Sequence, residues 1–259
     1  MTTPLDIAPL WFWASVAGLV GLAFGSFSTV LSWRWPRNES VVHPRSHCSS
    51  CERTLTPLEL VPVLSWVALR GRCRGCGERV HWRYPAIEVA SGALAAGAIL
   101  SFGATWKGLA AALLGVVLVP VIVIDLEHRL IPDIVVLPAA AAGLALMVAA
   151  DPGDWWKPLV AALGAAGFMF VLWFLYPAGM GFGDVKLTLL LGAVLGASVV
   201  PALFLAFGAG ALLGTILLVR HGAGARKMAV PFGPFLAAGA LVALWWGPSM
   251  IGWYTDRLG

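Results

Sequence analysis

Two acidic residues lie at the ends of long apolar runs, where charged side chains are uncommon. Asp125 closes the run 107–126, and Asp184 comes directly before the run 185–199. A charge at the centre of a membrane helix costs about 2.5–3.5 kcal/mol on insertion scales, and less near the interface, so acids kept there commonly have a function or a partner. Two carboxylates brought close together could share one proton. One would then activate a water molecule while the other, protonated, polarises a scissile carbonyl.

Each acidic residue also has a simpler interpretation. Asp184 could be a helix N-cap, where free N–H groups and the helix dipole favour an acid. Asp125 could be an interfacial charge solvated by lipid headgroups, and Asp133 is interpreted as a structural residue in the opening turn of the next helix. Gly181 and Gly183 remove side chains beside Asp184, which would let an extended peptide backbone approach the carboxylate.

The sequence lacks the motifs of other membrane protease classes. It contains no His-Glu-x-x-His pair for an intramembrane zinc site. No Ser or Cys stands in a nucleophile setting with a membrane His. The two carboxylates are therefore the candidates for hydrolysis.

All four cysteines lie in the polar segment 34–84, as Cys48-x-x-Cys51 and Cys73-x-x-Cys76 with 21 residues between the pairs. This spacing is typical of a structural zinc site, and four Cys ligands leave no open position for a reacting water. Two disulfides, or unrelated free thiols, are the alternatives. A reducing compartment for this segment would disfavour disulfides.

The elements that carry these residues are expected to be membrane helices. Hydrophobic residues make up 59% of the 259 residues and charged residues only 12%, with a mean hydropathy of +0.86. Each apolar run is long enough to cross, or nearly cross, a bilayer. The expected spans are 8–33, 85–103, 107–126, 132–150, 156–176, 185–199, 201–219 and 229–249. Eight spans are predicted, or seven if the two around residue 200 are one, with a turn expected at Val199-Val200-Pro201.

The basic residues predict the orientation. With eight spans, 14 of the 17 Lys and Arg residues fall on one side, among them nine Arg between 34 and 83 and the pair Arg226 and Lys227. The positive-inside rule makes that side cytoplasmic and places both termini on the opposite side of the membrane. The net charge of +4 is explained by this bias, so no nucleic-acid partner is expected.

The predicted fold class is therefore an all-α polytopic membrane protein of about eight transmembrane helices, with a small zinc-stapled cytoplasmic domain between the first and second. Residues 1–33 form the first transmembrane helix, interpreted as retained because they lack a basic n-region and a cleavage site. Residues 34–84 form the cytoplasmic domain, which is too short to bury much of a core unaided. Residues 85–259 form the remaining transmembrane domain.

The chain resembles the bacterial type IV prepilin peptidases, or leader peptidase/N-methyltransferases, of the GxGD aspartyl protease class. The likeness is an ordered set of motifs across nearly the whole chain rather than any one of them. The motifs are Gly25-Ser26-Phe27, the two Cys pairs, Arg83-Tyr84-Pro85-Ala86-Ile87-Glu88, Asp125, Ile131-Pro132-Asp133, Gly181-Phe182-Gly183-Asp184-Val185-Lys186 and Pro231-Phe232-Gly233-Pro234.

The resemblance implies an enzyme that removes the basic leader of prepilins or pseudopilins at the cytoplasmic face, with Asp125 and Asp184 as its catalytic residues. It also implies N-methylation of the new N-terminal residue by S-adenosylmethionine, associated with the cytoplasmic loop and the stretch from Gly25. Here Ser28-Thr29 stands where the family commonly has Leu-Asn. No Gly-rich nucleotide loop identifies a cofactor-binding residue.

Three other functions stay open from the sequence. The chain could be a peptidase without methyltransferase activity. It could be a proton-coupled membrane transporter that uses the two acids in an ion path, although no inverted repeat is visible. It could also be a membrane scaffold that presents a zinc module, in which case both acids would be dispensable.

Overall fold

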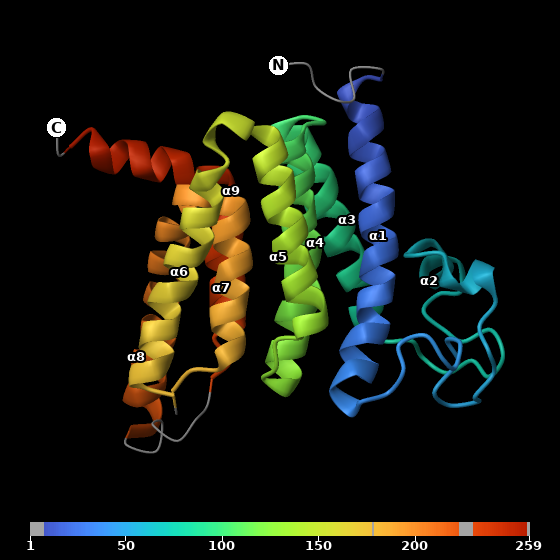
Figure 1. The fold of residues 1–259 in the computed structure, drawn as a ribbon. Coiled ribbons are helices and arrows are strands. Elements are labelled where there is room, and N and C mark those ends of the chain that lie inside the picture. Colours follow the sequence, from blue (N-terminus) through green and yellow to red (C-terminus); the bar gives the residue numbers. More distant parts are fainter. Residues whose placement is uncertain (1–7, 178, 223–229, 258–259) are drawn as a thin grey trace. The chain divides into compact units, whose positions relative to one another are not determined.

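A computed structural model describes residues 8–177, 179–222 and 230–257 of the chain (Figure 1). The expected positions of Arg226 and Lys227 lie outside these residues. The long helices are α1 (Leu10–Arg34), α3 (Arg83–Phe102), α4 (Trp106–His128), α5 (Asp133–Ala150), α6 (Trp156–Leu175), α7 (Phe182–Leu195), α8 (Val199–His221) and α9 (Gly233–Thr255). Short helical turns are η1 (Trp35–Arg37), η2 (Pro57–Leu60), α2 (Leu64–Ala68), η3 (Pro152–Asp154) and η4 (Gly196–Ser198). The described residues contain two isolated β-bridges and no extended strand, so the fold is all-α.

Seven segments of the described chain are long and apolar enough to cross a membrane, which makes this a polytopic membrane protein. One of them, 182–221, has 40 residues. A straight helix of that length would measure about 60 Å, twice the bilayer core. Instead η4 interrupts it, and α7 and α8 run in opposite directions (Figure 1). The α7–α8 hairpin corresponds to the two expected spans around residue 200, although α7, with 14 residues, is only about 21 Å long.

The turn in this hairpin differs from the predicted one. It lies at Gly196, which has a φ of +57°, and not at Val199-Val200-Pro201. Pro201 instead occupies the first turn of α8, where a missing N–H removes no helical hydrogen bond. A proline near an apolar boundary is therefore compatible with a helix start, and the glycine makes the turn.

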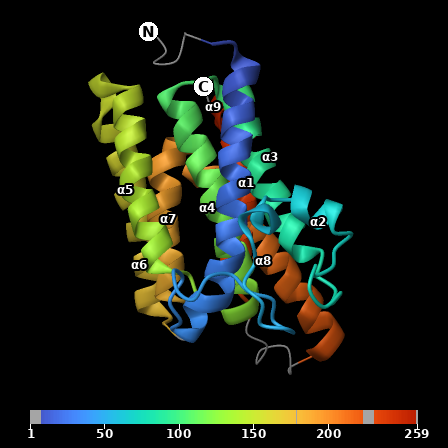
Figure 2. The ribbon, with the colours of Figure 1, turned by 90° about the vertical axis from the view of Figure 1, so that its right-hand side faces the viewer.

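The chain forms two compact units, residues 1–123 and 124–259. In the first unit α1 and α3 pack along each other (Figure 2). Gly21 and Gly25 make the close approach possible, because a Cβ at Gly21 would lie 2.6 Å from the carbonyl oxygen of Ser91 and one at Gly25 would lie 2.6 Å from the Cα of Glu88. Small residues at such positions are common where membrane helices meet.

The second unit is built around α7. This helix packs against α5, α6 and α9, while α8 packs against α9 (Figures 1 and 2). Leu187, Leu190 and Leu191 of α7 are fully buried. Because α7 is the most enclosed helix of this unit, a polar residue in its first turn is held by rigid surroundings.

Candidate active site and four-cysteine cluster

Asp125 lies in the last turn of α4 and is 5% exposed. Its Oδ2 accepts a hydrogen bond of 2.9 Å from the backbone N–H of Gly233, the first residue of α9. The first N–H groups of a helix have no partner within the helix and carry positive partial charge, so a carboxylate is a favourable acceptor there. Asp125 is therefore a buried, hydrogen-bonded side chain and not a charge solvated by headgroups.

Asp184 lies in the first turn of α7 and is 6% exposed. The N-cap of α7 is Gly181, so the interpretation of Asp184 as the N-cap is wrong. Its own N–H donates to the Gly181 carbonyl at 3.1 Å, and the buried Thr188 hydroxyl donates to the Asp184 carbonyl at 2.8 Å. The backbone at Asp184 is thus bonded on both sides, which holds this residue in the first turn of α7.

The two carboxylates lie close enough for their charges to interact. Among the acidic residues of the described chain, three are buried, namely Glu88, Asp125 and Asp184. Glu88 belongs to the first unit and accepts the N–H of Val63 at 2.7 Å. In the second unit the buried acids are therefore the predicted pair, although one is at the end of α4 and the other begins α7.

The two glycines near Asp184 have different surroundings. A Cβ on Gly183 would lie 2.9 Å from the Cβ of Ile131, so this glycine is required for packing. A Cβ on Gly181 would lie 3.7 Å from Oδ2 of Asp184, which is ordinary van der Waals contact. Gly181 therefore has space beside the carboxylate, as substrate approach would need, whereas Gly183 is already covered.

An ion pair that no sequence pattern predicts lies two residues from Asp184 along the chain. The Lys186 ammonium is 2.5 Å from Oδ2 of Asp133 and 5.1 Å from the centre of the Phe182 ring. Asp133 is the first residue of α5, as expected, and its partner is in α7. The pair joins the start of α5 to the start of α7, which agrees with the structural interpretation of Asp133. No sequence signal links residues 53 positions apart.

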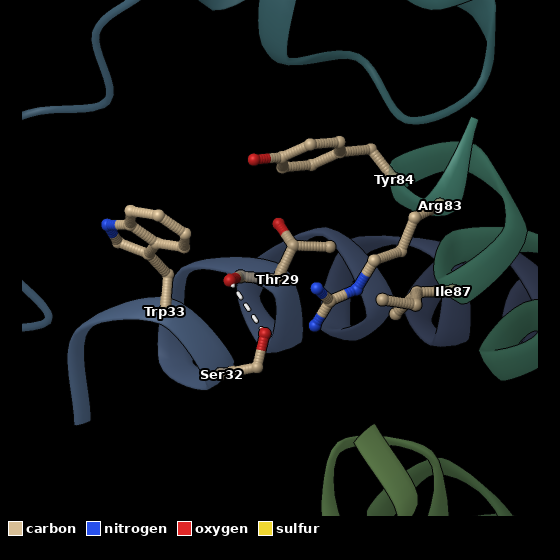
Figure 3. Close-up of a pocket in the computed structure, with 6 residues that line it drawn as sticks. All are labelled: Thr29, Ser32, Trp33, Arg83, Tyr84 and Ile87. Atoms are coloured by element: carbon tan, nitrogen blue, oxygen red, sulfur yellow. Dashed lines mark hydrogen bonds between the residues drawn. The ribbon is translucent and has the colours of Figure 1, made fainter. Parts of the chain in front are cut away.

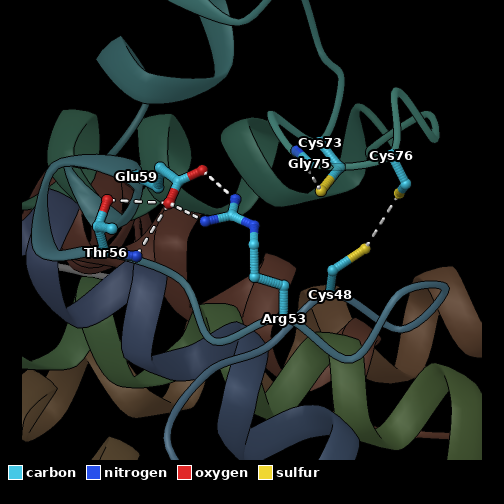
Figure 4. Close-up of polar contacts among 7 residues, drawn as sticks. All are labelled: Cys48, Arg53, Thr56, Glu59, Cys73, Gly75 and Cys76. Carbon is cyan, nitrogen blue, oxygen red and sulfur yellow. Dashed lines mark hydrogen bonds and ion pairs between the residues drawn. The ribbon is translucent and has the colours of Figure 1, made fainter.

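The four cysteines form one cluster in the first unit. Their sulfur atoms all lie within 4.8 Å of one another. Cys48 Sγ is 3.8 Å from Cys76 Sγ, and Figure 4 shows these two cysteines with Cys73. Tetrahedral zinc–sulfur bonds of about 2.3 Å would place the sulfurs about 3.8 Å apart. All four are free thiols, so the disulfide alternative is wrong. The arrangement could hold a metal ion.

The two halves of the cluster share one backbone design. The N–H of Glu52 donates to the Cys48 carbonyl at 2.9 Å, and the N–H of Gly77 donates to the Cys73 carbonyl at 2.9 Å. Both Glu52 and Gly77 have positive φ, +56° and +76°. The N–H groups of Cys76 and Gly75 lower the pKa of the Cys73 thiol to about 6. This favours the thiolate form that metals bind.

A partly buried ion pair braces the cluster. The Arg53 guanidinium donates to both oxygens of Glu59, at 3.1 and 2.5 Å, and Glu59 also accepts the N–H and the hydroxyl of Thr56 (Figure 4). These bonds, that of Arg53 first, lower the pKa of Glu59 to about 2. A Cβ on Gly75 would lie 2.9 Å from Nε of Arg53. Arg53, which follows the first Cys pair in sequence, therefore lies beside Gly75 of the second pair and binds Glu59 of η2.

A hollow opens between the end of α1 and the start of α3 (Figure 3). Thr29, Ser32 and Trp33 line it from α1, and Arg83, Tyr84 and Ile87 line it from α3. The Thr29 hydroxyl donates to the Ser26 carbonyl at 2.7 Å, so its oxygen remains an acceptor. The hollow is thus lined by a guanidinium, three hydroxyl groups and two aromatic rings.

These features define a class of protein, an all-α polytopic membrane protein with an interacting pair of buried carboxylates and a separate four-cysteine cluster. Comparison with known families then gives the particular family. Residues 19–102 match the bacterial Peptidase A24 N-terminal domain, and residues 112–219 match the type IV leader peptidase family. The chain belongs to the type IV leader peptidase family.

Similar proteins cover almost the whole chain. The prepilin leader peptidase/N-methyltransferase of Aeromonas hydrophila is 36% identical over 95% of each chain. Those of Bacillus subtilis and Legionella pneumophila are 37% and 33% identical, over 93% and 98% of this chain and 97% and 98% of their own. No solved structure matches the chain. The carboxylate pair lies in the second family segment and the cysteines in the first.

Proposed function

We propose that this protein is a membrane aspartyl endopeptidase that removes the leader peptide of type IV prepilins or pseudopilins, with Asp125 and Asp184 as its catalytic residues. The observation that supports this best is the interacting pair of buried carboxylates. The chain that carries them aligns over nearly its full length with proteins named prepilin leader peptidase/N-methyltransferase. A transporter or a scaffold is not favoured, because neither accounts for that family membership.

The proposed reaction needs both carboxyl groups. The ionised one takes a proton from a water molecule, and the water oxygen bonds to the scissile carbonyl carbon. The protonated one donates to the carbonyl oxygen and stabilises the charge that develops there. Collapse of the tetrahedral intermediate breaks the C–N bond, and the leaving amine takes up a proton. The products are a leader with a new carboxylate and a mature protein with a new amino terminus.

The location follows from the charge bias of the sequence. We place the protein in the bacterial inner membrane, with the segment 34–84 in the cytoplasm and both termini in the periplasm. A prepilin has an apolar N-terminal helix that can lie in the bilayer, so its basic leader would face the cytoplasmic segment. The four-cysteine cluster would hold a structural zinc ion that staples this segment.

We further propose that the protein methylates the new N-terminus, as the names of its relatives state for them. S-adenosylmethionine would supply the methyl group. Arg83 could bind its carboxylate, and the rings of Trp33 and Tyr84 could pack against its apolar or cationic parts. Ser28-Thr29 departs from the usual family pattern here, so a peptidase without methyl transfer is the alternative that the experiment must separate.

The test is incubation of the purified protein with a prepilin and S-adenosylmethionine, followed by intact-mass measurement. Asp125→Asn and Asp184→Asn should each abolish cleavage while the protein still inserts and folds. Cleavage by either variant at the wild-type rate would overturn the carboxylate pair. A cleaved but unmethylated product would leave a peptidase alone.

A further inference from the structure

The start of α9 makes a contact with Asp125 that has no part in the reaction proposed above. Its first residue, Gly233, donates its N–H to Oδ2 of Asp125 across 108 positions of sequence, and the contact is buried. Gly233 lies beyond the segment 112–219 that matches the family model, within the Pro231-Phe232-Gly233-Pro234 motif of the sequence. The question is whether this contact serves only packing or also the reaction.

The hydrogen bond determines how the Asp125 carboxyl group can take part. A backbone N–H can only donate, so Oδ2 is an acceptor in this geometry. The N–H favours the more electron-rich, unprotonated oxygen, so a proton shared by the carboxylate pair is better placed on Oδ1 of Asp125 or on Asp184. The bond also fixes the rotation of the carboxyl group. Oδ1 is therefore the Asp125 oxygen left for a water molecule or for Asp184.

The donor is itself held in place by aromatic packing. The ring centre of Phe232 lies 5.2 Å from that of Phe207 in α8 and 6.2 Å from that of Phe235 in α9. Leu236, one turn further along α9, is fully buried. The beginning of α9 is thus anchored, and the direction of the Gly233 N–H is set by rigid packing.

Glycine fits at this position without moving Asp125, whereas a larger residue does not. A Cβ at residue 233 would lie 2.6 Å from Oδ2, 3.1 Å from Cγ and 3.4 Å from Cβ of Asp125. Since both residues lie on packed helices, the added methyl group would turn or displace the carboxyl group. A misplacement of about 1 Å at a catalytic group can cost about 100-fold in rate.

We propose that Gly233 is a positioning residue for the proteolytic reaction, whose backbone N–H orients the Asp125 carboxylate and whose missing side chain makes room for it. This inference rests on the proposed function. It predicts a kinetic defect that ordinary helix-packing glycines do not share.

The same helix offers two control positions. A Cβ on Gly239 would lie 2.3 Å from the Ala202 carbonyl oxygen, far tighter than normal contact, but it would not meet Asp125. A Cβ on Gly252 would meet nothing within 4 Å. Gly239→Ala therefore tests a pure packing defect in α9, and Gly252→Ala tests the substitution itself.

The experiment compares the three variants of the full-length protein in prepilin cleavage, with kcat, KM and the pH profile measured separately. Gly233→Ala should lower kcat about 100-fold, leave KM within about twofold, and change the pH profile, because the protonation of the pair depends on the contact. Gly252→Ala should match wild type. Gly239→Ala should lower the yield and melting temperature, while its folded fraction keeps the wild-type pH profile. A Gly233→Ala variant with wild-type kcat and pH profile would overturn the inference.

A second measurement holds even where Gly233→Ala folds poorly. In an Asp125→Ala background the clashing carboxyl group is gone, so Gly233→Ala should lower the melting temperature much less than it does in the wild-type background. Equal losses in both backgrounds would show that the contact with Asp125 is not what excludes a side chain. If the wild type cleaves no prepilin, the proposed function fails together with the catalytic part of this inference. If Asp125→Asn is inactive but Gly233→Ala is normal, the inference fails alone.

Discussion

Gly183 and Ile131 lie against each other so closely that a Cβ on Gly183 would come within 2.9 Å of the Ile131 Cβ. Ile131 is in the turn that follows α4, the helix that carries Asp125, and Gly183 directly precedes Asp184 in α7. The contact therefore links the two segments that supply the carboxylates. Gly183 of the Gly-x-Gly-Asp motif therefore serves packing. The other glycine of the motif, Gly181, makes no such close contact.

The first prediction compares these two glycines. Gly183→Ala should destabilise the protein, because its methyl group must displace Ile131, and cleavage should fall with the folded fraction. Gly181→Ala has room beside Asp184, so the variant should fold normally, yet its methyl group would stand where a substrate backbone approaches. We expect a near-normal melting temperature with a KM raised or a kcat lowered at least severalfold. Thermal melts in detergent and cleavage assays decide the matter, and normal kinetics in Gly181→Ala would refute the access role.

The sequence was sufficient for the class of fold and for singling out the two buried carboxylates and the four clustered cysteines. Apolar runs of span length marked the helices, and acids at their ends marked Asp125 and Asp184. The cysteine spacing marked the cluster, because both pairs had to reach one ion. These are local patterns, and their physical meaning does not depend on which helices become neighbours.

The contacts between helices could not be read in the same way. Gly233 was visible only as part of a motif, and its bond to Asp125 depends on where α9 begins relative to α4. The pair Asp133–Lys186 depends on the packing of α5 against α7. The turn between α7 and α8 was predicted at Pro201, but a proline suits the first turn of a helix as well as a loop. Gly196 is the residue between these two helices that has a positive φ.

The second prediction concerns the metal. Cys73 is the buried member of the cluster and the pKa of its thiol is lowered to about 6, so Cys73→Ser should remove bound zinc and loosen the segment 34–84. The control is Ser49→Ala, an exposed position between the first two cysteines. Metal analysis of the purified protein and limited proteolysis of the segment measure the two effects. Intact wild-type protein without zinc would contradict the assignment of the metal.

A third prediction tests the brace between Arg53 and Glu59. The pKa of Glu59 in the folded protein is about 2, below its ordinary value of 4.5. The ionised carboxylate therefore stabilises the fold at every pH above about 4.5, and this contribution is lost only as the pH falls from there through about 2. Glu59→Gln should speed both the proteolysis of the segment 34–84 and the release of zinc to a chelator. Each rate should rise by a factor that stays constant throughout pH 6–8. A factor that changes across this range would show that another group controls the brace.

Arg53→Lys provides the matched test of geometry. Lysine keeps the charge but cannot donate to both carboxylate oxygens in a fixed fork. If the two parallel bonds matter, the lysine variant should resemble Glu59→Gln in its rate of zinc release. If charge alone matters, it should resemble wild type.

The last prediction separates methyl transfer from proteolysis. The hollow between α1 and α3 belongs to the first compact unit, whereas the carboxylate pair belongs to the second. Tyr84→Phe removes one hydroxyl from the rim, and Arg83→Gln removes the guanidinium that would hold a carboxylate. Both variants should cleave a prepilin at the wild-type rate, while the methylated fraction of the product falls, more for Arg83→Gln.

Arg79→Gln, an exposed position in the cysteine segment, should change neither activity. Intact mass of the mature substrate measures cleavage and methylation in the same sample. Full methylation by both variants would remove the hollow as the cofactor site, because the groups proposed to contact the methyl donor would then be dispensable for its use.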